Sequence, residues 1–413
     1  MNSVEGNTLP KGWVLETLGT VVELENGDRG KNYPSKKTLV SEGVPFINTG
    51  HLEGNKISKS KITYITEKHF ERLGSGKIKV NDILFCLRGS LGKFALNESI
   101  TKGAIASSLV IIRVKEELLN CNYLSFYLNS NIASDMIKEF DNGSAQPNLS
   151  SKNLKLFLIP LPPLQEQKHI VTKIDTLFAK IDTAITLTEE SLKQAKNLLP
   201  SVLNEVFETI DGEEKFLPEL VKEGRYSIKR GPFGSSLKKQ FFVPSGYKVY
   251  EQKHAIRDDF EIGEYFVNEE KYLELKAFDL KPRDIIISCS GTVGRIAVAP
   301  DNLMPGIINQ ALLKISLNED EIEIPFFTYW FNNYVNNGSL STKGAAIKNI
   351  VSVKELKAIP IKVPTLNSQN KICNQFDRYS QLSKQTQSKL EEQLVYLKQL
   401  KSSILSKAFK GEL

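Results

Sequence analysis

The sequence predicts a mixed α+β (α/β) protein with an internal pseudo-twofold repeat, in which two globular domains are joined by two long antiparallel coiled-coil helices. Three observations lead to this prediction. The chain of 413 residues aligns with itself at an offset of 202 positions. Short apolar runs between turn-forming residues, typical of strands, dominate the first part of each copy. A long glycine-poor stretch with alternating three- and four-residue apolar spacing, typical of a coiled coil, ends each copy.

The repeat covers whole domains rather than short units. Residues 82–84 match residues 284–286, and residues 89–95 match residues 291–297. In the trailing stretches, Pro162, Leu164, Gln167, Ile170, Asp175, Leu203 and Phe207 match Pro364, Leu366, Gln369, Ile372, Asp377, Leu405 and Phe409. A period of this length is too large for a solenoid. A chain that carries one module twice is expected to bind something that also comes in two parts.

These patterns divide the chain into two globular domains, residues 1–161 and 211–363, and two spacer helices, residues 162–210 and 364–413. In the first domain we expect strands at 44–47, 82–85 and 108–112 and a helix at 122–140. In the second domain we expect strands at 284–288 and 311–315 and a helix at 325–336. Each domain should hold an irregular, mainly antiparallel sheet.

Both spacer helices are expected to begin after a proline-marked junction, at 159–163 and 359–364,. Neither has a broad apolar face, which favours pairing of the two helices over the alternative of two amphipathic helices packed on separate domains. Twofold symmetry between the copies would make the pair antiparallel, with the domains at opposite ends and Leu413 near residues 7–12. Pro200 should break or kink the first helix near its end.

Composition narrows the class of protein. Lysine and arginine number 54 against 48 acidic residues, for a net charge of +6, which mildly favours a polyanionic partner,. Cys86, Cys121, Cys289 and Cys373 form no Cys-x-x-Cys pair, which argues against a zinc ribbon and is typical of a reducing cytoplasm,. Residues 1–12 lack an apolar signal region and no long apolar run occurs, so we expect a cytoplasmic protein without a membrane segment.

Three segments give the chain a wider resemblance. They are residues 161–167 (Leu-Pro-Pro-Leu-Gln-Glu-Gln), residues 231–235 (Gly-Pro-Phe-Gly-Ser) and residues 405–413 (Leu-Ser-Lys-Ala-Phe-Lys-Gly-Glu-Leu). In their order, and with the duplication, the chain resembles the specificity subunit of type I restriction-modification systems over almost its whole length. One departure is that residues 364–369 (Pro-Thr-Leu-Asn-Ser-Gln) degrade the motif that opens the helix in the second copy.

The resemblance implies two target-recognition domains that alternate with two repeated helical regions, and a subunit without catalysis of its own. It would bind a bipartite, asymmetric site in double-stranded DNA, one half per domain. Two modification subunits would dock on the helices and methylate adenine with S-adenosylmethionine. Restriction subunits would add an ATP-driven nuclease. S-adenosylmethionine, ATP and Mg²⁺ are thus expected on the partners, and no cofactor on this chain.

Motifs for catalysis are weak. The sequence has no Asn/Asp-Pro-Pro-Tyr/Phe motif and no phosphate-binding Walker loop, although residues 88–93 come close,. Asp259, Glu274 and Lys276 imitate a loose nuclease pattern, and His51, His69, His169 and His254 lack the spacing of metal ligands. Two alternatives stay open: a stand-alone DNA methylase or nuclease with an unrecognised site, and a coiled-coil scaffold that does not bind DNA.

The best candidate for DNA contact is the Gly-Ser/Thr-x-Gly-Lys/Arg turn that both copies keep. Its glycines would let backbone amides approach a phosphate, with Lys93 or Arg295 adding charge. The alternative is a tight strand-to-strand turn with an incidental cation. All candidate DNA-binding residues are basic, amide or hydroxyl side chains: Arg29, Lys31, Asn48, His51, Arg88, Ser90, Lys93, Lys238, Lys239, Lys253, His254, Arg257, Ser290, Thr292, Arg295, Asn309, Gln310, Lys343 and Lys348.

Specificity should differ where the two copies differ. One such place is residues 48–51 against residues 250–253, and another is residues 107–108 against residues 309–310.

Overall fold

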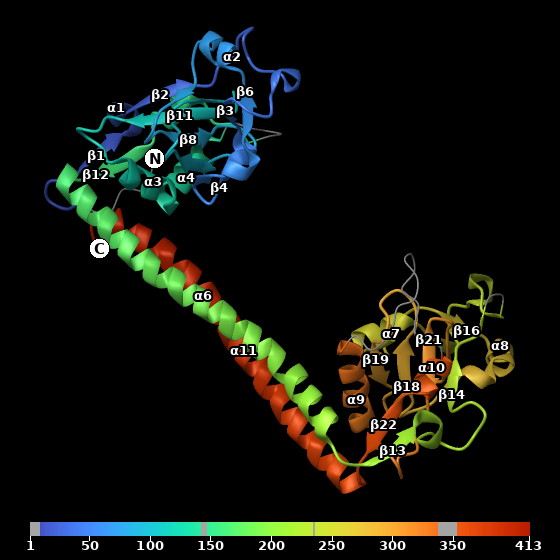
Figure 1. The fold of residues 1–413 in the computed structure, drawn as a ribbon. Helices are drawn as coiled ribbons and strands as arrows, with labels where there is room; N and C mark the ends of the chain where they lie inside the picture. Colours follow the sequence, from blue (N-terminus) through green and yellow to red (C-terminus); the bar gives the residue numbers. More distant parts are fainter. Residues whose placement is uncertain (1–8, 142–146, 234–235, 338–352) are drawn as a thin grey trace. The chain divides into compact units, whose positions relative to one another are not determined.

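The computed structural model describes residues 9–141, 147–233, 236–337 and 353–413. It divides into two compact units, which Figure 1 shows in sequence colours. The first unit comprises Met1–Glu189 and Glu392–Leu413, and the second comprises Glu190–Glu391. Each unit therefore holds one globular domain together with parts of both long helices.

The domain of the first unit contains two four-stranded sheets. One has the strand order β2 (Val22–Asn26), β11 (Leu109–Val114), β8 (Ile83–Cys86), β9 (Phe94–Leu96). The other has the order β6 (Thr63–Ile65), β3 (Val44–Ile47), β10 (Gly103–Ile105), β7 (Lys77–Ile78). Two-stranded pairs join β1 (Val14–Thr17) to β12 (Leu158–Leu161) and β4 (Leu52–Glu53) to β5 (Lys56–Ile57). Among the described strands of this unit only β3 and β10 pair in parallel, so the predicted antiparallel character is confirmed.

The second unit repeats both four-stranded sheets and the β1–β12 pair, whereas its described strands include no counterpart of the β4–β5 pair. Its four-stranded sheets have the orders β14 (Ile228–Arg230), β21 (Leu312–Ile315), β18 (Ile285–Ser288), β19 (Ile296–Val298) and β16 (Phe266–Val267), β15 (Tyr247–Tyr250), β20 (Gly306–Ile308), β17 (Asp279–Leu280). The pair β13 (Glu213–Phe216) and β22 (Pro360–Val363) corresponds to β1 and β12. The duplication inferred from the sequence is thus a duplication of the fold.

The central strands are apolar on both faces because each separates two cores. Val110 and Ile112 of β11 lie in a core shared with the helices, whereas Leu109 and Ile111 lie in a second core between the sheets. An unbroken apolar run is the pattern expected of a strand covered on both sides. The runs at 108–112 and 311–315 were therefore correctly predicted as strands.

Each domain also contains short helices. The first unit has α1 (Leu18–Val21), α2 (Glu67–Arg72), α3 (Cys121–Leu128), α4 (Asn131–Phe140) and α5 (Ser151–Leu154), and the second has α7 (Gln252–Arg257), α8 (Glu269–Glu274), α9 (Ile324–Asn336) and α10 (Val353–Lys357). The single helix predicted at 122–140 was wrong. Ser130 lies between α3 and α4, and its side chain accepts a hydrogen bond from the amide of Ala133 and starts a new helix,.

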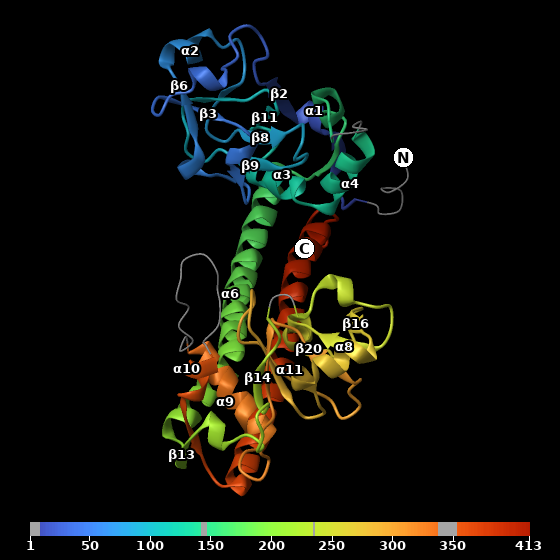
Figure 2. The same ribbon diagram turned by 90° about the vertical axis from the view of Figure 1, so that its right-hand side faces the viewer.

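Both predicted long helices are present, as α6 (Leu164–Thr209) and α11 (Leu366–Ala408). In the first unit, Lys401 of α11 contacts Asp182 of α6 at 2.5 Å, and Ile181 and Leu405 share one core. α3 lies at the beginning of α6, as Figure 2 shows. No described helix is long and apolar enough to cross a membrane.

The helices also pair within the second unit, and there their direction is clear. The Ser383 hydroxyl donates to the carbonyl of Ala195 at 2.6 Å, and further along α6 the ring of Phe207 lies 5.6 Å from that of Phe376. Rising numbers on α6 thus meet falling numbers on α11, so the pair is antiparallel. The alternative of two helices packed separately is excluded.

Two details of the helix prediction can be checked. α6 does not end at Pro200 but continues to Thr209, so the predicted break was wrong. Pro200 and Lys196, whose carbonyl loses its helical partner, are both exposed, and that carbonyl can be hydrated,. At the other end of α11, Gly411 lies against Pro10 in the first unit, as the antiparallel arrangement predicts. Residues 7 and 8 lie outside the described part.

A repeated buried glutamine anchors the start of each long helix. Gln167 is fully buried, its amide donates to the carbonyls of Leu118 and Pro162, and its oxygen accepts from the amide of Asn120. Gln369 makes the same three bonds in the second unit, to Glu321, Pro364 and Glu323. The degraded motif at 364–369 therefore keeps the buried glutamine that bonds the helix to its domain.

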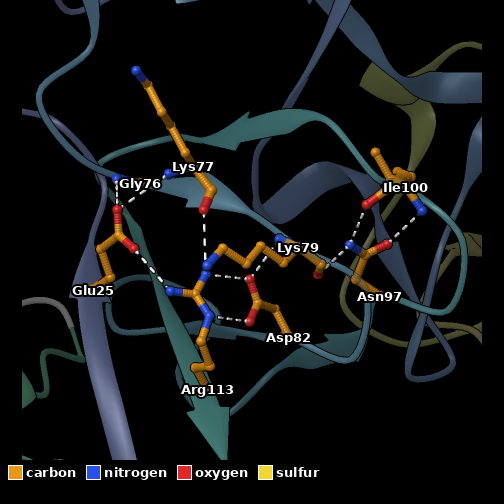
Figure 3. A network of polar contacts seen from close by, with 8 residues as sticks. All are labelled: Glu25, Gly76, Lys77, Lys79, Asp82, Asn97, Ile100 and Arg113. Atoms are coloured by element: carbon orange, nitrogen blue, oxygen red, sulfur yellow. Dashed lines mark hydrogen bonds and ion pairs between the residues drawn. The ribbon is translucent and has the colours of Figure 1, made fainter.

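A buried ion pair ties the two sheets of the first unit together (Figure 3). The Arg113 guanidinium donates to both carboxylate oxygens of Asp82, at 2.8 and 2.7 Å, and to Glu25, which itself accepts from the amides of Gly76 and Lys77. In the second unit the carboxylate equivalent to Asp82 is Asp284, and Lys314 supplies the cation, at 3.7 Å. Lys314 lies two residues before Ser316, the counterpart of Arg113, and therefore on the same face of its strand.

Candidate nucleic-acid interface

In the first unit, loops from both sheets meet at one edge, which we call the loop edge: residues 27–31, 48–51, 87–93 and 106–108. β2 and β8 both run antiparallel to β11, so both end where β11 begins. The amide of Ala106 donates to the carbonyl of Ile47, which brings the end of β3 to the same place. The topology thus gathers segments that are far apart in the sequence.

Hydrogen bonds from side chains connect these loops. The Thr49 hydroxyl lies 3.3 Å from that of Ser108, and the Lys93 ammonium donates to the carbonyl of Thr49 at 3.3 Å. The Arg29 guanidinium donates to the carbonyl of Ser107 at 3.4 Å. Arg29 and the exposed Arg88 line one cavity of about 340 Å³. Two arginines predicted from separate stretches of the sequence therefore face one hollow at the loop edge.

The repeated Gly-Ser/Thr-x-Gly-Lys/Arg turn connects β8 to β9 and β18 to β19. Gly89 and Gly92 have φ of 77° and 80°, a region that favours glycine,. The amides of Gly92 and Lys93 already donate to the carbonyls of Cys86 and Ser90. These two amides therefore close the turn rather than hold a phosphate, whereas Ser90 between the two glycines is exposed.

Two of the candidate histidines are structural. The His51 ring nitrogen Nδ1 accepts from the amide of Asn48, whose side chain accepts from the amide of Gly50. His254 is fully buried, Nδ1 accepts from the amide of Glu251 at 2.8 Å, and Nε2 lies 2.7 Å from the carbonyl of Ile262. Burial lowers the pKa of both rings. In each case an uncharged ring accepts, through Nδ1, the backbone hydrogen bond that caps the loop after the strand.

The buried histidines predict a pH-dependent stability. Because folding lowers the pKa of His254, the unfolded chain takes up the proton first, so stability is full above about pH 6.5 and falls as the pH drops below it,. The loss is at most about 1.4 kcal/mol per pH unit for each histidine. Thermal unfolding between pH 7.5 and 5.5 should show a smaller decrease for His254→Gln than for the wild type. His169→Gln, at an exposed helix position, should leave the decrease unchanged.

The structure corrects the correspondence between the copies by one residue. His51 matches His254, at an offset of 203, because both cap the loop after the equivalent strand. Ala106 matches Asn309, since their amides bond to the last residues of β3 and β15. Residues 48–51 therefore correspond to residues 251–254 of the second copy, and residues 107–108 correspond to residues 310–311. The two comparisons made from the sequence were each one position out of register.

In the second unit the loop edge consists of residues 231–233, 251–257, 289–295 and 309–311. Ser290, Thr292 and the exposed Arg295 lie in the β18–β19 loop, Arg257 ends α7, and Gln310 is exposed before β21. Lys253 pairs with Glu251 at 2.7 Å, and the Asn309 side chain accepts from the amide of Ala311.

The remaining candidates are placed less closely. Lys31 is exposed in the loop after β2, and Lys238 and Lys239 are exposed between β14 and β15. Lys343 and Lys348 lie outside the described residues.

Sequence reasoning did not single out Arg230 at this edge, and it included Gln252 only within residues 250–253, one of the places where the copies differ. Arg230 is the last residue of β14, and Gln252 is the first residue of α7. The Arg230 Nε and the Gln252 Oε1 are buried, and no described residue gives either a hydrogen-bond partner. Arg230 follows Lys229 and Gln252 precedes Lys253, but basic pairs of this kind are common in the chain and did not single out either residue. The position before Gly231, which packs against the backbone of Asn309, was the one available hint.

Asp259, Glu274 and Lys276, which imitate a nuclease pattern in the sequence, do not form one site. Glu274 pairs with Lys271 at 2.8 Å, and Lys276 pairs with Asp279 at 3.0 Å. Asp259 lines a cavity together with Lys248, and neither Glu274 nor Lys276 lines that cavity. Within the described residues, no three histidine, cysteine, aspartate or glutamate side chains come together as a possible metal site.

Comparison with known proteins agrees with this architecture. The family model described as "Type I restriction modification DNA specificity domain" matches residues 10–194 and 203–393. The EcoBI specificity subunit of Escherichia coli is 28% identical over 97% of this chain and 86% of its own length. The StySPI specificity subunit of Salmonella potsdam is 23% identical over 98% of this chain and 90% of its own length.

Solved structures share the fold. The HsdS subunit of Thermoanaerobacter tengcongensis has a TM-score of 0.68 at 20% identity, covering 99% of each chain. A chain from a structure of complex assembly and conformational transition of the type I R-M system has a TM-score of 0.75 at 22% identity, covering 98% of this chain and 100% of its own. Because the family model covers most of the chain in two copies, the chain belongs to the family of type I restriction-modification specificity subunits.

Proposed function

We propose that this chain selects the DNA site of a type I restriction-modification complex and that each domain reads one half of a bipartite, asymmetric sequence. The observation that carries the proposal is the repeated loop edge. Both units gather cations and amide or hydroxyl side chains at the same edge of the same fold, but the side chains differ. Cations neutralise phosphates, and side chains that differ in hydrogen-bonding groups select different bases.

The chain is proposed to be non-catalytic and cytoplasmic and to hold the other subunits of the complex. Two modification subunits would dock on the paired helices, where Leu382, Val395 and Tyr396 of α11 are apolar and 53%, 55% and 63% exposed. Those subunits would bind S-adenosylmethionine, and restriction subunits would bind ATP and Mg²⁺. Its similarity to specificity subunits of type I restriction enzymes supports membership in such a complex.

A domain exchange tests the proposal. Residues 13–160 are replaced by the corresponding segment of the EcoBI specificity subunit, and duplexes bound by the full chain at low salt are selected from a random pool. One half of the enriched sequence should change and the other should stay. The wild-type chain is the control, and its failure to enrich any sequence would favour a scaffold without DNA binding. Binding of S-adenosylmethionine by the isolated chain would favour a stand-alone methylase.

A further inference from the structure

The two unpartnered polar atoms of the second unit lie beside the same loop. Arg230 lies near Cys289, where its positive charge opposes the rise in the cysteine pKa that burial causes. The Gln252 amide lies beside Gly291, since a Cβ atom at that glycine would be 3.8 Å from Nε2. Cys289 and Gly291 both belong to the loop between β18 and β19. Both side chains therefore converge on the loop edge.

Buried polar groups in folded proteins are almost always hydrogen-bonded, so an unpaired one needs an explanation. The two groups here are complementary in kind. Arg230 Nε is a donor that lacks an acceptor, and Gln252 Oε1 is an acceptor that lacks a donor,. A ligand that satisfies both must offer acceptors and donors within one small area.

An aromatic ring holds the arginine at the surface. The Arg230 guanidinium lies 5.6 Å from the ring centroid of Phe233, whose side chain is 70% exposed. A cation–π contact of this kind restrains the guanidinium, whose N–H groups lie in its own plane and can donate two parallel hydrogen bonds to one acceptor group. The pair is thus arranged before any ligand arrives.

The described residues of the first unit lack this feature. Asn26 matches Arg230, since they pair with the matching residues Val110 and Leu313, and its amide donates to the Ser151 hydroxyl at 3.4 Å. Thr49 matches Gln252, two residues before the capping histidine, and its hydroxyl contacts Cys86 and Ser108. The same two positions are satisfied internally in one copy and unsatisfied in the other.

We propose that Arg230 and Gln252 determine the half-site of the second domain, Arg230 by donating to guanine and Gln252 by pairing with adenine in the major groove. The inference rests on the proposed function. Guanine presents the acceptors O6 and N7 to an arginine fork, and adenine presents the N6 donor that Gln252 Oε1 lacks and the N7 acceptor for its amide. A DNA phosphate would accept from Arg230 but offers no donor to Gln252. The edges of the bases can therefore bond to both side chains, whereas the DNA backbone can bond to Arg230 alone.

The test is selection from random duplexes at low salt with the full chain and two variants. Arg230→Lys keeps the charge but replaces the planar fork by a single ammonium, and should weaken the preference for guanine at one base pair, which is worth roughly 5- to 150-fold for a good bidentate pair. Gln252→Glu keeps the size and should change one preferred adenine to cytosine, whose N4 group donates to a carboxylate. Both changes should fall in the same half of the sequence.

The matched control is Arg225→Lys, an exposed arginine that stacks on Tyr226 before β14. It should leave the selected sequence unchanged. Arg230→Met removes an unpaired donor and should not lower the melting temperature, which separates recognition from folding. If Arg230→Lys does not fold, Gln252→Glu decides the matter alone.

Two results would overturn the inference. One is an unchanged selected sequence in the folded variants, and the other is a uniform loss of affinity over all sequences with a weaker salt dependence, which indicates phosphate contact. In either case the wild-type chain would still select a two-part sequence. Failure of the wild type to select any sequence would instead refute the proposed function.

Discussion

Replacing Arg113 by methionine is expected to lower the free energy of unfolding of the first unit's domain by roughly 3–5 kcal/mol. The Asp82 side chain is 1% exposed, and both of its oxygens accept from the Arg113 guanidinium. Removing the cation leaves a buried carboxylate whose remaining hydrogen bond, among the described residues, comes from the amide of Lys79. For a domain of this size the melting temperature should fall by roughly 10 °C.

Hydrogen exchange resolved by peptide is the measurement, because it separates the two units. Protection should fall in β7, β8 and β11 and remain in β18 and β21. Lys152→Met, which changes an exposed cation of the same domain, is the control. The double variant Arg113→Met with Asp82→Asn should recover part of the loss, because an amide costs less to bury than an unpaired charge. Equal stability of the single and double variants would contradict the assigned role of the pair.

The large-scale features could be predicted because their signals are local or repeat. The strand at 44–47 follows from an apolar run between turn residues, and the long helices follow from a spacing that persists over many turns,. The break between α3 and α4 could not be read from periodicity. Apolar residues continue through it, and only the capping geometry of Ser130 ends one helix and begins the next.

The candidate interface was only partly predictable, for a different reason. The topology that joins Arg29, Arg88 and Lys93 depends on which strands pair, which no short motif encodes. The two copies also differ by one residue in some loops, so a constant offset places Ser108 against Gln310, whereas hydrogen bonding places it against Ala311. Arg230 and Gln252 stand out by unsatisfied atoms, a property that exists only in the folded chain.

The repeated glutamine gives the second large effect. Gln167→Leu is expected to destabilise the first unit by about 3 kcal/mol, because one buried carbonyl, one partly buried carbonyl and one partly buried amide lose their partner together and each unpaired buried group costs about 1–3 kcal/mol,. Gln369→Leu should do the same in the second unit, through Glu321, Pro364 and Glu323.

The neighbouring exposed positions supply matched controls for these two variants. Gln165→Leu and Asn367→Leu make the same kind of change within two residues of each anchor, at exposed sites, and should shift the melting temperature little,. Thermal unfolding with exchange at the junctions measures both. The loss should be confined to the unit that carries the change, since each glutamine bonds only to residues of its own unit. If the anchor and control variants melted alike, the glutamines would be incidental, and the retention of Gln369 in an otherwise degraded motif would need another cause.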